Sequence, residues 1–235
     1  MAWRSNGTTN AEMVEALWKN GLLKQEAVRD AFLAIDRRWF IPRSIPESYA
    51  AAYKDIPQQI GYNVTNSAPH MLCIMTEIVV DHAGGTLNGK KILDIGSGSG
   101  MLTTVFAHLG GDKCQVIGVD HVPQLVEWGM SVTLERFPEW CSGPAPRLQF
   151  LLGDGRLGLP QHAPFDVIHV GAAAPEIPDV LVAQIALGGI MVIPVGVQEQ
   201  ALIVVKKDLN GKVTTTNSMG VRFGLLTDLS SQLKR

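Results

Sequence analysis

The sequence predicts an α/β fold: a doubly wound, mostly parallel seven-stranded sheet with an antiparallel C-terminal hairpin and N-terminal helices. Three observations favour this fold. From Lys90 onward, near-continuous apolar runs alternate with helical patterns, as buried parallel strands and their connecting helices do. A loop with three glycines follows the first apolar run. The turn dipeptide Asn210-Gly211 separates the last two β-rich runs.

Length and composition indicate one globular domain. Of the 235 residues, 46% are hydrophobic and 18% charged, whereas a disordered chain has fewer apolar residues and more net charge. There are 20 basic and 22 acidic residues without a run of lysine or arginine, so nucleic acid and membranes are not expected partners. The three cysteines form no C-x-x-C pair, which argues against a disulfide framework and a zinc site. We expect no bound metal and a cytoplasmic location.

The N-terminal part of the sequence predicts helices and irregular chain. Asn10 is expected to cap a first helix that ends at Gly21, and a second helix covers residues 24–37. Residues 41–66 contain three prolines and predict irregular structure with a short helix over 47–53. Irregular segments of this length are uncommon in compact domains and are often functional.

A polar cluster precedes the next apolar stretch, which predicts a helix over residues 69–82. Ser67 is expected to cap this helix, and Pro69 suits its first turn because a missing N–H costs nothing there. This stretch alone leaves open whether the cluster also carries chemistry.

The C-terminal part alternates between strand and helix patterns until the final hairpin. The predicted strands cover residues 90–96, 114–120, 148–155, 165–174, 189–196, 201–208 and 212–223. The predicted helices between them cover residues 101–110, 122–137 and 178–186.

The glycine loop after the first strand reads Gly96-Ser97-Gly98-Ser99-Gly100. Glycine lets the backbone turn sharply and approach a ligand closely, and open α/β sheets bind ligands at this crevice. A tight turn without a ligand is the alternative, but three alternating glycines exceed what a turn needs. The dinucleotide fingerprint G-x-G-x-x-G fails in both possible frames.

An acidic residue ends each of the first three strands. Asp94 would repel a pyrophosphate and favour a cation, such as the amino group or sulfonium of S-adenosylmethionine. Asp120 can accept both hydroxyls of a ribose, and Asp154 can reach an adenine edge. The alternatives are a helix N-cap for Asp120 and a turn aspartate for Asp154. Together the three acids and the loop predict a nucleoside pocket of the kind found in class-I methyltransferases.

Further motifs resemble the protein-L-isoaspartate (D-aspartate) O-methyltransferase family, particularly its animal-type members. They cover nearly the whole chain in order: MAW at the start, NSAPHM, LDIGSGSG, VIGVDH, GDGR, PFDVIHVGAAAPEIP, GGIMVIPVG and the late LTD. The segments SAPHM and HVGAAAP are more specific than the glycine loop, which every class-I methyltransferase carries.

The resemblance implies transfer of a methyl group from S-adenosylmethionine to the α-carboxylate of isoaspartyl residues, with S-adenosylhomocysteine as the product. The ester then closes to a succinimide that reopens partly to aspartate. The resemblance implies a Rossmann-like class-I sheet with an altered strand order at its end. It makes Ser67 the catalytic candidate, with Val64, Thr65, Asn66 and His70 on the substrate side, although His70 can also pack internally. The cofactor contacts that it implies are Asp120, His121, Asp154, Gly155, Thr227 and Gln232.

This sequence departs from the family pattern at two places. Asn66 stands where the family usually has isoleucine, and residues 224–227 read GLLT instead of VPLT. Because glycine adds flexibility, Gly224 is expected to loosen a tail that resembles the peptide-gripping part of the family.

The acceptor chemistry agrees with the resemblance, because a carboxylate is already an anion at neutral pH and needs no general base. Arg222 and Arg156 are candidates for a carboxylate clamp, with a solvated arginine as the alternative.

We expect one domain over residues 1–235, with N-terminal helices and a substrate-side lid over 1–68, a cofactor-binding core over 69–196 and a hairpin and tail over 197–235. The expected partners are isoaspartyl proteins and peptides, and the expected state is a monomer. The competing readings are another class-I methyltransferase, a catalytically silent cofactor-binding adaptor and, more remotely, a NAD-linked dehydrogenase.

Overall fold

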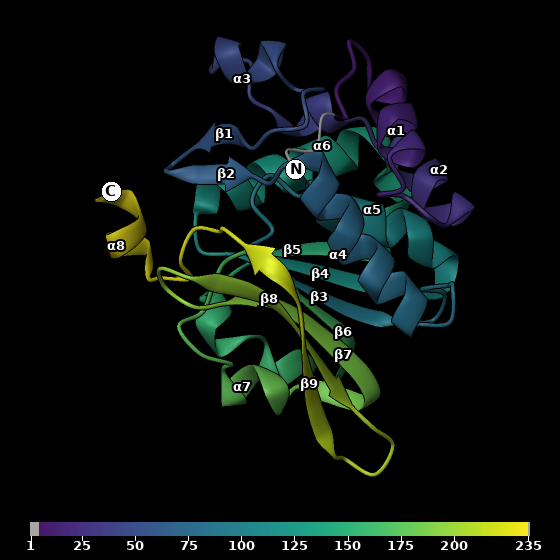
Figure 1. Ribbon diagram of the computed structural model, residues 1–235, viewed down its shortest axis with the longest axis vertical. Coiled ribbons are helices and arrows are strands. Elements are labelled where there is room, and N and C mark those ends of the chain that lie inside the picture. The colour runs from purple at the N-terminus through teal and green to yellow at the C-terminus, as the bar shows by residue number, and fades with distance from the viewer. Residues whose placement is uncertain (1–4, 235) are drawn as a thin grey trace.

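The computed structural model describes residues 5–234, so the MAW motif at residues 1–3 lies outside the described part. A seven-stranded sheet forms the centre of the molecule, in the order β5-β4-β3-β6-β7-β8-β9 (Figure 1). Strands β3 to β7 run parallel, whereas β8 is antiparallel to β7 and to β9. The strands are β3 Lys91–Ile95, β4 Gln115–Asp120, β5 Leu148–Leu152, β6 Phe165–Val170, β7 Ile185–Val195, β8 Gln200–Lys207 and β9 Val213–Val221. The predicted fold class is confirmed.

Helices cover the two faces of the sheet unequally. The helices that follow β3 and β4 lie on one face together with three from the N-terminal part, and the short α7 lies on the other (Figure 1). Side-chain alternation matches this division: Ile92 of β3 joins the larger hydrophobic cluster and Leu93 the smaller one. The helices are α1 Asn10–Lys19, α2 Glu26–Ala34, α4 Pro69–His82, α5 Met101–Gly110, α6 Pro123–Arg136 and α7 Asp179–Val182.

Strand order reverses between β3 and β6, since β4 and β5 lie on one side of β3 and the later strands lie on the other. In an open α/β sheet, the carboxyl ends of the strands at such a reversal form the usual ligand crevice. The crevice here is bounded by the glycine loop after β3 and by Gly171 after β6. The loop nitrogen of Gly171 donates to the carbonyl of Ile95 at 2.7 Å, which fixes the two strand ends together.

The first two helices differ from the prediction at their ends. Thr9 caps α1 through its side chain, and Asn10 is instead buried, with its amide donating to the carbonyl of Phe32 at 2.8 Å. The expected cap at Asn10 is therefore wrong, while Gly21 does end the helix in a left-handed conformation. Helix α2 is shorter than predicted, and a separate 3-10 turn, η1 (Arg37–Phe40), follows it.

The segment expected to be irregular contains a small hairpin as well as the predicted short helix, α3 (Pro46–Ala50). Strands β1 (Gln58–Gly61) and β2 (Val64–Asn66) pair antiparallel. Tyr62 and Asn63, the two turn residues, both have positive φ, as the tightest hairpin turns require. This hairpin leads directly into α4, and its Ile60 and Val64 side chains lie beside Gly98 of the glycine loop.

Helix α4 has the predicted bounds, but Ser67 does not cap it. Ala68 occupies the cap position without a side-chain hydrogen bond, and Pro69 lies in the first turn as expected. The chain ends in a last short helix, α8 (Leu229–Leu233). Within residues 5–234, no helix has the length and apolar character needed to span a bilayer.

Candidate active site

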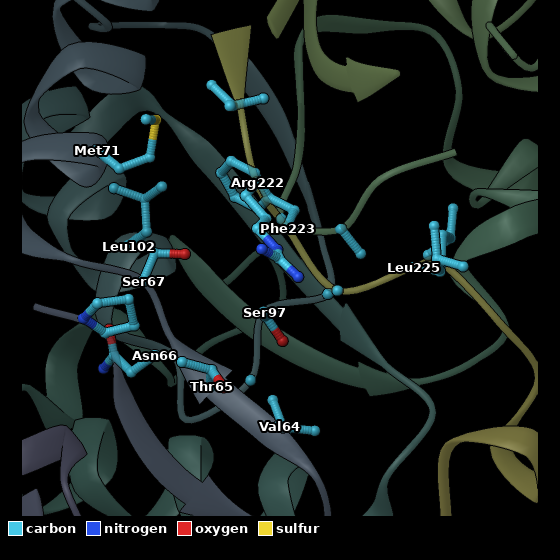
Figure 2. Close-up of a pocket in the computed structure, with 18 of the residues that line it drawn as sticks. Val64, Thr65, Asn66, Ser67, Met71, Ser97, Leu102, Arg222, Phe223 and Leu225 are labelled. Carbon is cyan, nitrogen blue, oxygen red and sulfur yellow. The ribbon is translucent and has the colours of Figure 1, made fainter. Parts of the chain in front are cut away.

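A cavity of about 980 Å³ opens at the carboxyl ends of β3, β4 and β6. The β1–β2 hairpin and the start of α4 form one wall, and the chain from the end of β9 to α8 forms the other. Figure 2 shows Ser67 and Arg222 with their polar ends directed into this space. All five predicted substrate-side residues line it: Val64, Thr65, Asn66, Ser67 and His70. Nine of the eleven predicted cofactor residues also line it: Asp94, Gly96, Ser97, Gly98, Asp120, His121, Gly155, Thr227 and Gln232.

The glycine loop divides into a ligand-facing part and a packing part. Gly96 and Gly98 have positive φ and line the cavity. Gly100 also has positive φ, but it is buried outside the cavity lining, and a Cβ there would come within 2.6 Å of Cζ of Phe150. The third glycine is thus required by packing, so its predicted cofactor contact is not supported by the geometry.

Asp120, at the end of β4, is almost completely buried and faces the loop. One carboxylate oxygen accepts from the backbone N–H of Gly98 and the other from that of Val122, both at 2.9 Å. Burial raises the pKa of Asp120, and these hydrogen bonds oppose the shift. Each oxygen keeps a further lone pair, so the side chain can still accept two ligand hydroxyls.

Asp94 forms a buried pair with His169, which lies beside it on β6. His169 Nδ1 lies 2.6 Å from one Asp94 oxygen, and the hydroxyl of Thr103 donates to the other at 2.5 Å. His169 Nε2 is buried in the cavity wall and lacks a hydrogen-bond partner within residues 5–234, as does the buried Oγ of Ser97. Sequence reasoning missed His169, although the HVGAAAP motif contains it.

Asp154 does not lie among the cavity-lining residues. Its carboxylate accepts from the Arg156 side chain, with Nε–Oδ1 at 3.0 Å and Nη2–Oδ2 at 2.6 Å, and this arginine lowers the pKa of Asp154. The backbone N–H of Arg156 also donates to Asp154, which caps a 3-10 turn. This geometry fits the alternative interpretation of Asp154 as a turn aspartate. It also engages the guanidinium of Arg156, which is therefore not free to bind a substrate carboxylate.

Ser67 is half-buried at the mouth of the cavity. Its hydroxyl forms no hydrogen bond with the described residues, whereas the Thr65 hydroxyl accepts from the Gln59 side chain at 3.2 Å. Because the Ser67 hydroxyl does not cap α4, it is available to donate a hydrogen bond to a ligand.

Two buried polar contacts hold the segment on either side of Ser67. Arg37, which is fully buried, donates from Nη1 to Oδ1 of Asn66 at 2.8 Å. Asp55 accepts from the backbone N–H of His70 at 2.9 Å and lies 2.8 Å from His70 Nδ1. Asn66 and His70 therefore contribute to the cavity wall with side chains that are bound internally.

The C-terminal tail is tied down at several points despite Gly224. The Gly224 carbonyl accepts from Ala173 N at 2.8 Å, and Leu226 N donates to the Ala173 carbonyl at the same distance. The Gln232 side chain donates to the carbonyl of Asn63 at 2.6 Å, so α8 closes onto the β1–β2 turn. The looser tail expected from glycine is not apparent in these contacts.

The comparisons with known proteins agree with this geometry. The family model that describes Protein-L-isoaspartate(D-aspartate) O-methyltransferase (PCMT) matches residues 8–231. Protein-L-isoaspartate O-methyltransferase of Triticum aestivum is 40% identical over 96% of this chain and 94% of its own length. The Caenorhabditis elegans protein of that name is 37% identical over the full length of both chains.

A solved structure supports the same assignment. A protein-L-isoaspartate O-methyltransferase from Plasmodium falciparum, in complex with S-adenosyl-L-homocysteine, superimposes with a TM-score of 0.82 at 26% identity. The match covers 94% of this chain and 99% of that one. The chain thus belongs to the protein-L-isoaspartate(D-aspartate) O-methyltransferase family.

Proposed function

We propose that this chain methylates the free α-carboxylate of L-isoaspartyl residues in damaged proteins and peptides. The ester would then close to a succinimide and so begin repair. The observation that carries the proposal is that one cavity is lined by the glycine loop, by Asp120 and by Ser67, whose hydroxyl has no hydrogen-bond partner within residues 5–234.

The residues at the strand ends fit a positively charged nucleoside donor. S-adenosylmethionine supplies an electrophilic methyl group on a sulfonium. Asp120 would accept the ribose hydroxyls, because both of its oxygens retain acceptor capacity. Ser97 Oγ and His169 Nε2 are buried polar atoms that lack partners within residues 5–234, and a bound polar group would satisfy them. Asp94 would act through His169. His121, Gly155, Thr227 and Gln232 would frame the remaining surface.

The acceptor requires positioning more than proton transfer. A carboxylate with a pKa of about 4 is already ionised at neutral pH. Aligning nucleophile, methyl group and sulfur contributes up to roughly 7–11 kcal/mol. The Ser67 hydroxyl would hold one carboxylate oxygen on line through a charge-assisted hydrogen bond of about 1.5–3 kcal/mol. If it acted wholly in the transition state, this bond would contribute roughly one to two decades in rate.

Specificity would come from the walls of the cavity. An isoaspartyl link shifts the carboxylate by one methylene relative to the backbone, so a wall that binds the backbone would misplace an ordinary aspartate. Val64 and Thr65 on β2 and the tail after β9 form opposite walls. Asn66 and His70 would keep the first wall in place. The three widely spaced cysteines favour a reducing compartment, so we further propose a cytoplasmic enzyme, and we propose that it is a monomer.

A pair of peptides tests the function. An isoaspartyl peptide and its normal aspartyl twin are incubated with the enzyme and methyl-labelled S-adenosylmethionine. We expect base-labile label on the isoaspartyl peptide alone, at the isoaspartyl residue by mass spectrometry. Equal labelling of both peptides would indicate another methyltransferase. Stoichiometric donor binding without labelling of either peptide would indicate a silent adaptor.

A further inference from the structure

Arg222 occupies a distinctive place at the mouth of the cavity. It follows β9 directly, on the edge strand of the sheet, and Figure 2 shows its guanidinium directed into the cavity. Within the described part of the chain, it is the only lysine or arginine that lines this space. It also lines a second cavity of about 380 Å³, which shares Gln198, Gln200 and Phe223 with the first. Arg222 therefore lies where the two spaces join.

The guanidinium of Arg222 is exposed and forms no ion pair or hydrogen bond within residues 5–234. The other charged candidates are engaged: Arg156 is bound by Asp154, and Arg37 is buried against Asn66. Among the acids of the cavity, Asp94 and Asp120 have internal partners as well. Glu199, on the turn before β8, also lines the cavity but is not ion-paired with Arg222. The Arg222 guanidinium thus has no ion-pair partner within residues 5–234 and is available to a ligand that enters the cavity.

The backbone next to Arg222 is held by hydrogen bonds, although the guanidinium group of Arg222 has no partner within residues 5–234. The Gln200 side chain accepts from the N–H of Phe223 at 2.6 Å and donates to the carbonyl of the same residue at 3.0 Å. The carbonyl of Gly224 accepts from Ala173 at 2.8 Å. These contacts hold the Cα of Arg222 at the cavity edge, so its side chain needs no backbone movement to reach a ligand.

We infer that Arg222 captures the acceptor carboxylate and distinguishes the substrate from the methylated product. This inference rests on the proposed function. The acceptor carries one negative charge before transfer and none as the methyl ester. A cation at the mouth of the cavity therefore attracts the anionic carboxylate of the substrate but not the neutral methyl ester of the product. The contact is strongest in the ground state, so it lowers KM without raising kcat.

A peptide with a single anion tests this role. The probe is an isoaspartyl peptide that is acetylated, amidated and free of aspartate and glutamate, so its only carboxylate is the acceptor. For Arg222→Met we expect KM to rise about tenfold, the effect of losing one charge-assisted hydrogen bond. We expect kcat to be unchanged or slightly higher, and donor affinity by calorimetry to be unchanged. Arg222→Lys should retain part of the effect.

Two controls separate capture from other effects. Lys206→Gln removes one exposed positive charge from the same β8–β9 hairpin, at its far end, and should leave KM unchanged. Added salt should raise the KM of the wild type more than that of Arg222→Met. The methyl ester of the probe should inhibit both enzymes equally.

The inference would be overturned by a KM for Arg222→Met within twofold of the wild type. It would also be overturned by an equal rise in Lys206→Gln, or by a rise confined to peptides with an acidic flanking residue. Since the wild type must first methylate the probe, failure of the proposed function is distinguishable from failure of this inference.

Discussion

Arg37 donates a 2.8 Å hydrogen bond from Nη1 to Oδ1 of Asn66, directly before Ser67, and both partners are buried. Its Nη2 lies 3.4 Å from the Asn66 carbonyl, so the guanidinium holds both the side chain and the backbone. Burial lowers the pKa of Arg37 to about 9, which leaves it charged at neutral pH. The asparagine that departs from the family pattern is thus the acceptor for a buried cation.

Replacing Asn66 should reveal this contact. Asn66→Ile leaves Arg37 with a buried, unpaired donor, and we expect it to lower the free energy of unfolding by about 1.5–3 kcal/mol. Arg37→Met/Asn66→Ile removes both polar partners and should recover much of that loss. Asn66→Asp keeps an acceptor and should stay close to the wild type. Chemical denaturation measures all three, and an Asn66→Ile protein as stable as the wild type would contradict this account.

Removing the Ser67 hydroxyl should affect turnover more than binding. We expect Ser67→Ala to lower kcat at least tenfold, because one aligned hydrogen bond to the carboxylate is lost. Donor affinity, measured by calorimetry, should stay nearly intact. Ser218→Ala removes an exposed hydroxyl from β9 outside the cavity and serves as the matched control. Unchanged turnover in Ser67→Ala would refute the assigned role.

Asp120 should make donor binding depend on pH. Its pKa is raised by burial, and only the carboxylate form accepts both ribose hydroxyls. The Kd for the donor should therefore rise on acidification, beginning above the usual aspartate range. Asp120→Asn should bind weakly at neutral pH and show a flatter profile. Calorimetry across pH provides the test; equal affinity of the two proteins at neutral pH would defeat the assignment.

The raised pKa of Asp120 has the opposite effect on the stability of the ligand-free protein: acidification weakens donor binding but raises the contribution of Asp120 to the free energy of unfolding. A raised pKa in the folded state means that the folded chain binds the proton more tightly than the unfolded chain. This contribution to stability is present at low pH and is lost as pH rises through the folded-state pKa.

Gly100 should tolerate no side chain. Its φ is +89°, and an added Cβ would meet the Phe150 ring at 2.6 Å. We expect Gly100→Ala to cost about 1–3 kcal/mol in the free energy of unfolding. Gly220→Ala is the control, because φ there is not positive and no atom lies within 4 Å of the added Cβ. Equal stability of the two variants would show that the loop can adjust.

The regular parts of the fold could be predicted because periodicity and end signals agree there. Helices α4 and α5 have the predicted bounds, since Pro69 and Gly100 each mark a start. The β1–β2 hairpin was missed because its turn, Tyr62-Asn63, lacks the glycine that usually signals such turns, and its strands are very short.

The site could be predicted where the chemistry lies in one local motif. The loop, Asp120 and Ser67 all reach the cavity. Asp154 lies outside the cavity lining and its carboxylate is paired with Arg156, only two residues away, so its cofactor contact stays a prediction. Arg37 and His169 could not be assigned, since their partners lie 29 and 75 residues away and depend on the tertiary fold.

The most direct test of the central claim is a crystal structure with S-adenosylhomocysteine and an isoaspartyl peptide bound together. We predict the ribose on Asp120, the sulfur facing Ser67, and an acceptor carboxylate oxygen hydrogen-bonded to Ser67 Oγ on the side from which it would attack the methyl group. A nucleoside bound away from residues 96–98, or a Ser67 side chain directed away from the sulfur, would contradict the account.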